Sequence, residues 1–224
     1  MTARTAVASS HARDLMRLSP ARFNRFLGGL AQNLTWQPSA VCPCVNQHSG
    51  AADPSCPHCD GKGRRWGVAQ TSKAGIVSRE ILRKFAPMEI LDAGDVMLVV
   101  PSDESCYALG EYDRVILTDR TEPFSLNLVR GVNDALRWEP VSISAVAWIG
   151  ANGAMAAGAL PDGWEDGKPT WTAGAPPQGT TYALTGRRNP EYYCWLTLPL
   201  DRPHHAGEPL PRRVVLRRFD LFGA

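Results

Sequence analysis

The sequence lacks several features that would place a protein in a functional class at once. It contains no run of the roughly 20 apolar residues that a membrane-spanning helix requires, so we expect no membrane partner. Its 24 Lys+Arg residues nearly balance 22 Asp+Glu residues, and this small positive excess does not by itself indicate a nucleic-acid partner. Glycine-rich phosphate loops of the P-loop or dinucleotide type are missing too. Function must therefore be argued from less common motifs.

The first residues lack the apolar segment of a secretory signal. Residues 1–18 form a basic arm with Arg4, Arg13 and Arg17, for which a mitochondrial presequence is the alternative. We expect a cytosolic, reducing environment. In such an environment clustered cysteines bind metal more often than they form disulfides.

Four of the six cysteines lie close together and form the most specific motif. Cys42-Pro-Cys44 is followed, after eleven residues, by Cys56-Pro-His-Cys59-Asp-Gly-Lys-Gly. A Cys-x-x-Cys turn aims both sulfurs at one point, and the glycine after it lets the chain leave tightly. Four thiolates complete a tetrahedral zinc site and leave no open position. We therefore predict a structural zinc held by Cys42, Cys44, Cys56 and Cys59.

Alternatives remain for this site at the level of the sequence. His48 or His58 would replace one cysteine as an accessory ligand, or the cysteines would hold an iron–sulfur cluster or form disulfides. Lys62, Arg64 and Arg65 follow the second cysteine pair and would offset the excess negative charge of four thiolates on a divalent metal. These cations are also candidates for contact with a phosphate or an acidic partner.

From residue 87 onward the pattern is that of strands. The 20 glycines and 18 prolines supply many turns, and no helix-length periodic segment appears after residue 90. Runs of β-branched and aromatic residues predict strands at 95–100, 114–117, 141–149, 181–184, 192–198 and 213–219. Alternation in the last run predicts an edge strand with Arg217 or Arg218 pointing outward. We expect a mainly β protein, a small antiparallel barrel or sandwich, with short helices and extended arms.

Composition divides the chain into three parts. Residues 1–35 are predicted to be an arm and a short helix, residues 36–70 the zinc-binding module, and residues 71–224 a β-rich domain with a long Gly/Pro-rich loop at 150–179. That loop is expected to carry one short edge strand around residues 170–172. Residues 71–85 fit a helix or a strand equally well.

The short helix is predicted to begin at Ser19-Pro20, where a hydroxyl cap precedes proline at the first helical position. Its apolar stripe consists of Phe23, Phe26, Leu27 and Leu30. We expect this stripe to pack on the helix's own domain, with docking on a neighbouring subunit as the alternative.

Residues suited to catalysis are few. His204 and His205 are adjacent in a loop, where such pairs are usually solvated. Cys106 and Cys194 have no base beside them in the sequence and are expected to be buried as small apolar groups. We therefore expect a protein that is not an enzyme.

Three parts of the chain resemble neck proteins of tailed bacteriophages, the head-to-tail connector or head-closure class with a zinc-knuckle N-terminal half. The first is WQPSAVCPC at 36–44 with CPHCDGKG at 56–63. The second is AGDVMLVVP at 93–101 with YDRVIL at 112–117, and the third is WTAGAPPQGTTY at 171–182 with PEYYCWL at 190–196 and a basic C-terminal strand.

The resemblance implies a virion protein of the neck, present in the host cytoplasm during assembly. It implies a homo-oligomeric ring between portal-side connector proteins and tail proteins, closing the filled head and docking the tail. Cations such as Arg217 and Arg218 would then be candidates for contact with neighbours or with genomic DNA in the channel. Only the zinc cysteines carry over residue by residue.

Two other functions compete with this one. A zinc-knuckle nucleic-acid-binding protein would use Lys62, Arg64 and Arg65 for phosphates and Trp66 for stacking on bases. A virion hydrolase would depend on His204, His205 and scattered carboxylates.

Overall fold

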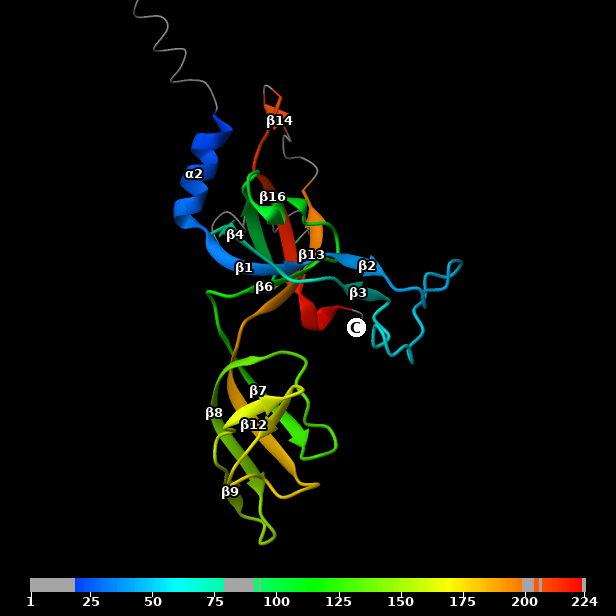
Figure 1. Cartoon of the computed structure of the whole chain (residues 1–224), viewed down its shortest axis with the longest axis vertical. Coiled ribbons are helices and arrows are strands. Elements are labelled where there is room, and N and C mark those ends of the chain that lie inside the picture. Colours follow the sequence, from blue (N-terminus) through cyan, green and yellow to red (C-terminus); the bar gives the residue numbers. More distant parts are fainter. Residues whose placement is uncertain (1–18, 79–90, 93, 199–203, 206, 223–224) are drawn as a thin grey trace, which may run out of the picture. The chain divides into compact units, whose positions relative to one another are not determined.

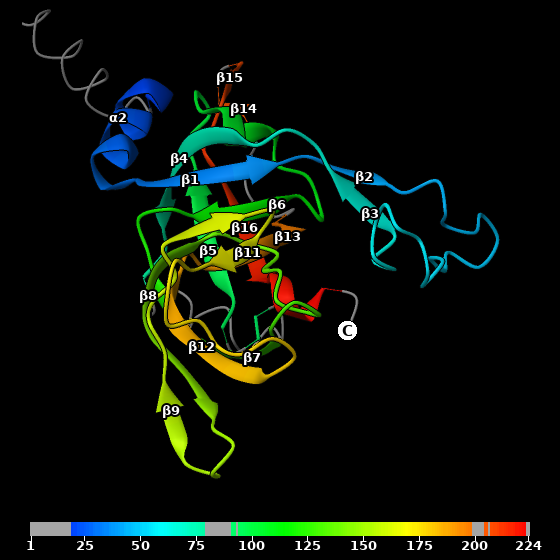
Figure 2. The same cartoon turned by 60° about the horizontal axis from the view of Figure 1, so that its bottom comes forward.

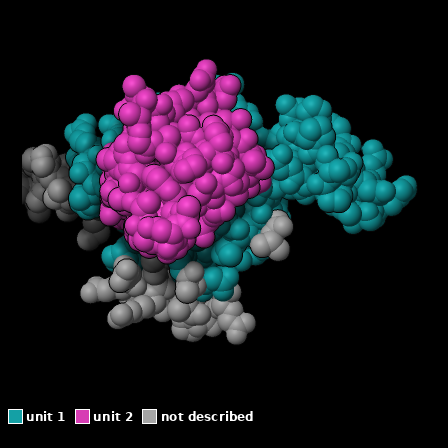
Figure 3. Space-filling model, turned by 90° about the horizontal axis from the view of Figure 1, so that it is seen from below, with its two compact units in different colours: residues 1–115, 191–224 teal, residues 116–190 magenta. Residues whose placement is uncertain are grey.

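The computed structural model describes residues 19–78, 91–92, 94–198, 204–205 and 207–222. The chain divides into two compact units (Figure 3). Unit 1 comprises residues 1–115 and 191–224, and unit 2 comprises residues 116–190. These boundaries differ from the expected ones, because the chain leaves a β-domain at residue 115 and returns to it at residue 191. Unit 2 is therefore an insertion within the region that the sequence presented as one β-rich domain.

Unit 1 is built on a closed barrel of strands in the order β1-β4-β5-β16-β13-β6 (Figures 1 and 2). The strands are β1 (Gln32–Gln37), β4 (Gln70–Ile76), β5 (Val96–Val100), β6 (Arg114–Leu117), β13 (Glu191–Thr197) and β16 (Arg212–Arg218). The pairs β1–β4, β4–β5, β5–β16 and β16–β13 are antiparallel. The mainly β prediction is confirmed, and its barrel form is the one observed for unit 1. The ambiguous segment starts as strand β4, while residues 79–85 of it lie outside the described residues.

Strand β16 lies inside the barrel sheet and is not the predicted edge strand. It pairs with β5 on one side and with β13 on the other. Val214 and Leu216 are fully buried, and Val215 between them packs with Met97 and two other buried residues on the opposite face. Both faces of the strand are therefore covered, which explains why three consecutive apolar residues occur here. The edge-strand prediction relied only on the alternation of polar and apolar residues within 213–219.

Helix α2 (Pro20–Leu30) begins as predicted, and the Ser19 hydroxyl accepts a hydrogen bond from the Arg22 backbone N–H at 3.4 Å. The inward face differs from the predicted stripe. Leu27 is buried, but Phe23, Phe26 and Leu30 have 42%, 64% and 63% of their surface exposed. The other buried helix residues are Pro20 and Asn24. Asn24 replaces an apolar side chain on this face because its amide bonds to Ser102 at the end of β5.

A two-stranded ribbon carries the cysteine module. Strand β2 (Ser39–Val41) pairs antiparallel with β3 (Arg64–Trp66), so the chain between them forms loops that begin and end at the same place. The ribbon continues outward from β1 and β4 of the barrel, as Figures 1 and 2 show. The predicted module at 36–70 thus shares its first and last residues, Trp36 and Gln70, with the barrel.

Unit 2 contains a four-stranded sheet in the order β7-β12-β8-β9. Its strands are β7 (Glu122–Val129), β8 (Pro140–Ile149), β9 (Met155–Ala157) and β12 (Thr181–Arg188), and a hairpin is formed by β10 (Gly163–Glu165) and β11 (Lys168–Thr170). The predicted strand at 141–149 is present, and that at 181–184 continues four residues further. The Gly/Pro-rich segment 150–179 contains three short strands rather than one.

A β-bulge changes which residues of β8 face the core. The register between β8 and β12 shifts at Thr185/Gly186, so that Ala145 and Ile143 oppose consecutive residues of β12. Side-chain direction therefore switches within β8, and Val146 is buried while Ile149 is 60% exposed. Alternate residues of 141–149 therefore do not share one buried face along the whole strand.

The remaining elements are small. Strand β14 (His204–His205) pairs with β15 (Glu208–Pro209), and the short 3-10 helices are η2 (Ser105–Ala108) and η3 (Phe219–Leu221). Among the helices that the structure describes, none combines the length and the apolar character needed to cross a lipid bilayer.

Candidate metal centre

The β2–β3 ribbon brings the two halves of the cysteine motif together. Val41 pairs with Arg64 at the end of the ribbon. One residue further on, the Cys42 backbone N–H donates to the Gly63 carbonyl at 2.9 Å. This ladder places the first cysteine beside the turn that follows the second Cys-x-x-Cys pair. The thirteen residues between Cys42 and Cys56 in the sequence therefore close into one loop.

Tight turns aim the thiols at a common point. The backbone N–H of Asp60 donates to the Cys56 carbonyl at 3.0 Å, and the N–H of Gly63 donates to the Cys59 sulfur at 3.3 Å. Gly61 has φ +74°, and an added Cβ would lie 3.2 Å from the Pro54 carbonyl oxygen. A side chain at this position would be strained and crowded, so the predicted role of Gly61 as the exit turn fits.

The four cysteine sulfurs, those of Cys42, Cys44, Cys56 and Cys59, lie within 4.8 Å of one another. The sulfurs of Cys42 and Cys56 are 3.9 Å apart, and those of Cys44 and Cys59 are 3.5 Å apart. A tetrahedral metal with metal–sulfur bonds of about 2.3 Å requires sulfurs about 3.8 Å apart. A disulfide would require about 2.05 Å, and all four cysteines are free. The residues present fit a metal ion such as zinc.

The two histidines considered as replacements lie outside this cluster. His48 and His58 are exposed, and the group of metal-ligating side chains found among the described residues consists of cysteines only. Their backbones serve the loops instead, since the His48 N–H donates to the Asn46 side chain at 2.8 Å.

Hydrogen bonding makes the thiols unequal. A backbone hydrogen bond from His58 lowers the pKa of Cys56 to about 7, with smaller contributions from the thiols of Cys44 and Cys59. The pKa of Cys44 is raised to about 12, because burial and the three neighbouring thiols outweigh a backbone hydrogen bond from Asp53. Cys56 is therefore the first of the two to become a thiolate, the form in which cysteine binds metal.

An aromatic cluster fixes the base of the module to the barrel. Trp66 at the end of β3 packs edge-on against Phe219 and Phe222, with ring centroids 5.1 and 5.6 Å away. Its indole N–H donates to the Tyr112 carbonyl at 3.1 Å. Phe222 also packs against Tyr193 of β13 at 4.9 Å. The indole is therefore occupied by the protein itself and is not presented for stacking on a base.

The cations after the second cysteine pair have different surroundings. The Lys62 ammonium donates to the Phe222 carbonyl at 3.4 Å and lies 5.2 Å from the Phe219 ring centroid. The Arg64 guanidinium lies 3.9 Å from the Tyr112 ring centroid. Arg65 is exposed. Two of the three predicted interaction residues therefore hold the module against the aromatic cluster.

The C-terminal cations are paired with carboxylates. Arg217 reaches Asp92 at 2.6 Å and Asp95 at 3.1 Å, and its side chain is only 15% exposed. Its guanidinium also covers the Trp195 ring at 4.3 Å. Arg218 pairs with Asp220 at 3.4 Å. One of these two arginines was predicted to point outward, and Arg217 is the more buried of the two because it lies against the buried carboxylate of Asp95.

Sequence reasoning missed a carboxylate that organises this region. Asp113 is buried and accepts hydrogen bonds at 2.7 Å from the backbone N–H groups of Ser39 and Gly110. One oxygen thus holds the first residue of β2, and the other holds the turn before β6. No local pattern indicated this role, since Ser39 lies 74 residues away in the sequence.

The other reactive side chains lie apart from the cysteine cluster. Cys106 and Cys194 are fully buried, as predicted, and burial raises the pKa of Cys194 to about 12. His204 and His205 form strand β14 instead of a loop, and neither belongs to a metal-ligating group among the described residues.

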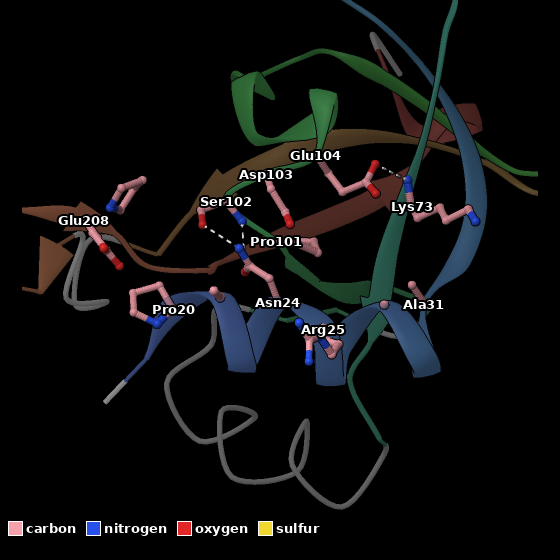
Figure 4. A pocket seen from close by; sticks show the side chains of 13 residues that line it. Pro20, Asn24, Arg25, Ala31, Lys73, Pro101, Ser102, Asp103, Glu104 and Glu208 are labelled. Carbon is pink, nitrogen blue, oxygen red and sulfur yellow. Dashed lines mark hydrogen bonds between the residues drawn. The ribbon is translucent and has the colours of Figure 1, made fainter. Parts of the chain in front are cut away.

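A separate hollow lies where α2 meets the barrel (Figure 4). It has a volume of about 650 Å³. Asn24 and Ser102 are joined by hydrogen bonds within it, and Glu104 accepts from the Lys73 backbone N–H at 3.2 Å. Its rim carries charges of both signs, including Arg25 and Glu208. The polar side chains of Asn24, Ser102 and Glu104 therefore already have hydrogen-bond partners within the protein.

Comparison with known proteins adds no relative: no protein-family profile matches the chain, and no curated protein matches it.

Proposed function

We propose that this protein is a structural component of a tailed-phage neck, part of the head-to-tail connector that closes the filled head and docks the tail. The observation that carries the proposal is the cysteine module, a four-thiolate site at the end of a ribbon whose base is held by Trp66 and Asp113. We take the metal to be zinc, which such a site binds with no position left for a substrate. Zinc there supplies folding free energy, and the chain's own residues supply a stiff projecting surface.

Exposed apolar side chains support a role in assembly. Phe26 and Leu30 on α2 and Val41 and Val68 near the ribbon are each at least 60% exposed. On α2, Phe23, Phe26 and Leu30 recur at i, i+3 and i+7, and a contiguous exposed apolar face of this kind favours contact with other subunits. A homo-oligomeric ring that meets portal-side and tail proteins, located in the virion neck after assembly in the host cytoplasm, would use such surfaces.

The decisive experiment is cryo-electron microscopy of the virions that contain this chain. We expect a ring of copies at the head–tail junction, and density for the chain elsewhere, or none, would contradict the proposal. Elemental analysis of the purified protein should give one zinc per chain. Native mass spectrometry should show a closed ring, alone or with its neck partners.

A nucleic-acid-binding function remains the second candidate, favoured by the exposed Arg65 beside the module. It predicts binding to single-stranded nucleic acid that weakens steeply with salt and is reduced in Arg65→Ala. Binding that is missing at low salt removes this candidate without affecting the neck proposal.

A further inference from the structure

Unit 2 contains three buried polar atoms that have no hydrogen-bond partner. They are Oδ1 of Asp134, the hydroxyl of Tyr182 and Nη1 of Arg130. Asp134 is 4% exposed and Tyr182 is 1% exposed, so bulk water does not satisfy them. Most buried polar groups in proteins have a partner, and leaving one without costs stability. Three such atoms in one part of a small unit require an explanation.

The three residues come from the same end of the β7–β12 pair. Leu128 pairs with Tyr182, and the Arg130 backbone N–H donates to the Thr180 carbonyl at 3.1 Å. The following turn folds back, so that the Gly131 N–H donates to Oδ2 of Asp134 at 2.8 Å. Only one carboxylate oxygen of Asp134 is used by this turn.

Trp171 forms the wall beside these groups. The Arg130 guanidinium lies 4.1 Å from the Trp171 ring centroid, and the Tyr182 ring meets Trp171 edge-on at 6.0 Å. The Trp171 indole N–H is already bonded to the Ala159 carbonyl at 2.9 Å, so it offers no donor. Burial raises the pKa of the Tyr182 hydroxyl to about 12; the negative charge of Asp134 adds to this rise, and the positive charge of Arg130 opposes it.

We propose that unit 2 binds one trapped water molecule that bridges Asp134 Oδ1, the Tyr182 hydroxyl and Arg130 Nη1. The hydrogen-bonding capacities match. A water donates one hydrogen to the carboxylate and accepts a bond from the guanidinium, and it either donates its second hydrogen to the Tyr182 hydroxyl or accepts a bond from that hydroxyl. About three bonds is the usual number for a buried water. The water joins the turn after β7 to strand β12 beside the Trp171 ring, and it stabilises unit 2 as an internal ligand.

A crystal structure of the full-length, zinc-loaded protein, at a resolution that shows ordered water, tests the site directly. We expect density for a single water within hydrogen-bond distance of all three atoms. Side chains that turn to bond one another directly, or a site with no density, would overturn the proposal.

Thermal unfolding of variants gives an independent test. Tyr182→Phe should lower the midpoint of the unit 2 transition by about 4–8 °C, the shift expected for the roughly 1 kcal/mol of one hydrogen bond in a unit that spans residues 116–190. Asp134→Ala should lower it further, because this change also removes the bond from the Gly131 N–H. The double variant should lose less than the sum, because either change already releases the water. Tyr107→Phe is the matched control: its hydroxyl donates to the Leu210 carbonyl at 3.1 Å in unit 1, so it should leave the shift that Asp134→Ala causes in the unit 2 transition unchanged. Full additivity of Tyr182→Phe with Asp134→Ala contradicts the proposed bridge.

Discussion

The cysteine module and unit 2 are both rich in turns, yet they are stabilised by different means. The hydrophobic cluster at the centre of the module consists of Cys42, Cys56 and Cys59, with Cys44 and Val45 packed against it. Unit 2 instead buries a cluster of Phe124, Leu128, Val146, Tyr182 and Leu184 and surrounds it with tryptophans. A segment as short as the module cannot bury enough apolar surface, so we expect metal ligation to stabilise it. Unit 2 is long enough to build a core from aromatic residues.

Removing the metal should affect only the module, and this is the largest effect that we expect. Structural zinc sites contribute on the order of 10 kcal/mol to folding, so Cys56→Ser with Cys59→Ser should unfold the loops between β2 and β3 outright. Hydrogen exchange should rise there and remain unchanged in unit 2. The variant Cys194→Ala, at a buried cysteine outside the cluster, should keep one zinc per chain.

A substitution that opens a cavity in the core of unit 2 should destabilise unit 2 and leave the cysteine module unchanged. Leu184 is fully buried within the hydrophobic core of unit 2, and Leu184→Ala should lower the free energy of unfolding of unit 2 by about 2–5 kcal/mol. Zinc content, measured on the same sample, should stay at one per chain. Loss of zinc in this variant would show that the two regions are not independent in stability.

Trp66→Ala separates the anchoring of the module from its metal binding. The indole packs on Phe219 and Phe222 and is not part of the sulfur cluster, so zinc should be retained. Because the side chain is half-buried, we expect a loss of about 2 kcal/mol, below the value for a fully buried tryptophan. Hydrogen exchange in β2 and β3 reports the loosening. Trp195→Ala, which removes a ring covered by Arg217, should leave exchange in the ribbon unchanged.

Acidification should weaken the module gradually and leave unit 2 intact. Metal binding requires thiolates, and the pKa of Cys56 is lowered to about 7. Protons already compete with the metal for Cys44 above this pH, because the pKa of Cys44 is raised to about 12, and below pH 7 they compete for Cys56 as well. Each proton displaced should reduce zinc affinity about tenfold per pH unit, or about 1.4 kcal/mol. Competition with a chromophoric chelator across this range measures the slope. An affinity that does not change with pH would be inconsistent with four thiolate ligands.

Local signals predicted the parts of the fold that depend on neighbouring residues. The helix start at Ser19-Pro20, strand β6 and the cysteine ligand set were all predictable, because a cap, a short β-branched run and a Cys-x-x-Cys turn act within a few residues. Strand β1 and the ribbon strands were not predicted, since Gln, Asn, Ser and Arg fill them and pairing with β4 and with each other decides their structure.

Long-range contacts account for the remaining differences. Sequence alternation in 213–219 suggested an edge strand, but barrel closure places β16 between two partners and Arg217 over a buried Asp95. The predicted apolar stripe lies within α2, but Leu27 is its only buried member. The helix also buries Asn24, which the apolar pattern did not include. In β8 a bulge, which periodicity does not reveal, reversed the buried face.

The sequence by itself determined where a metal can bind and that the chain folds mainly into strands, because ligand chemistry and strand propensity are local properties. The tertiary structure decided that β6 and β13 belong to one barrel although unit 2 lies between them in the chain. It also decided which cations face solvent, where Asp113 clamps the ribbon, and which polar atoms of unit 2 are buried together. These outcomes depend on packing between residues far apart in the sequence, and no pattern within a short window contains them.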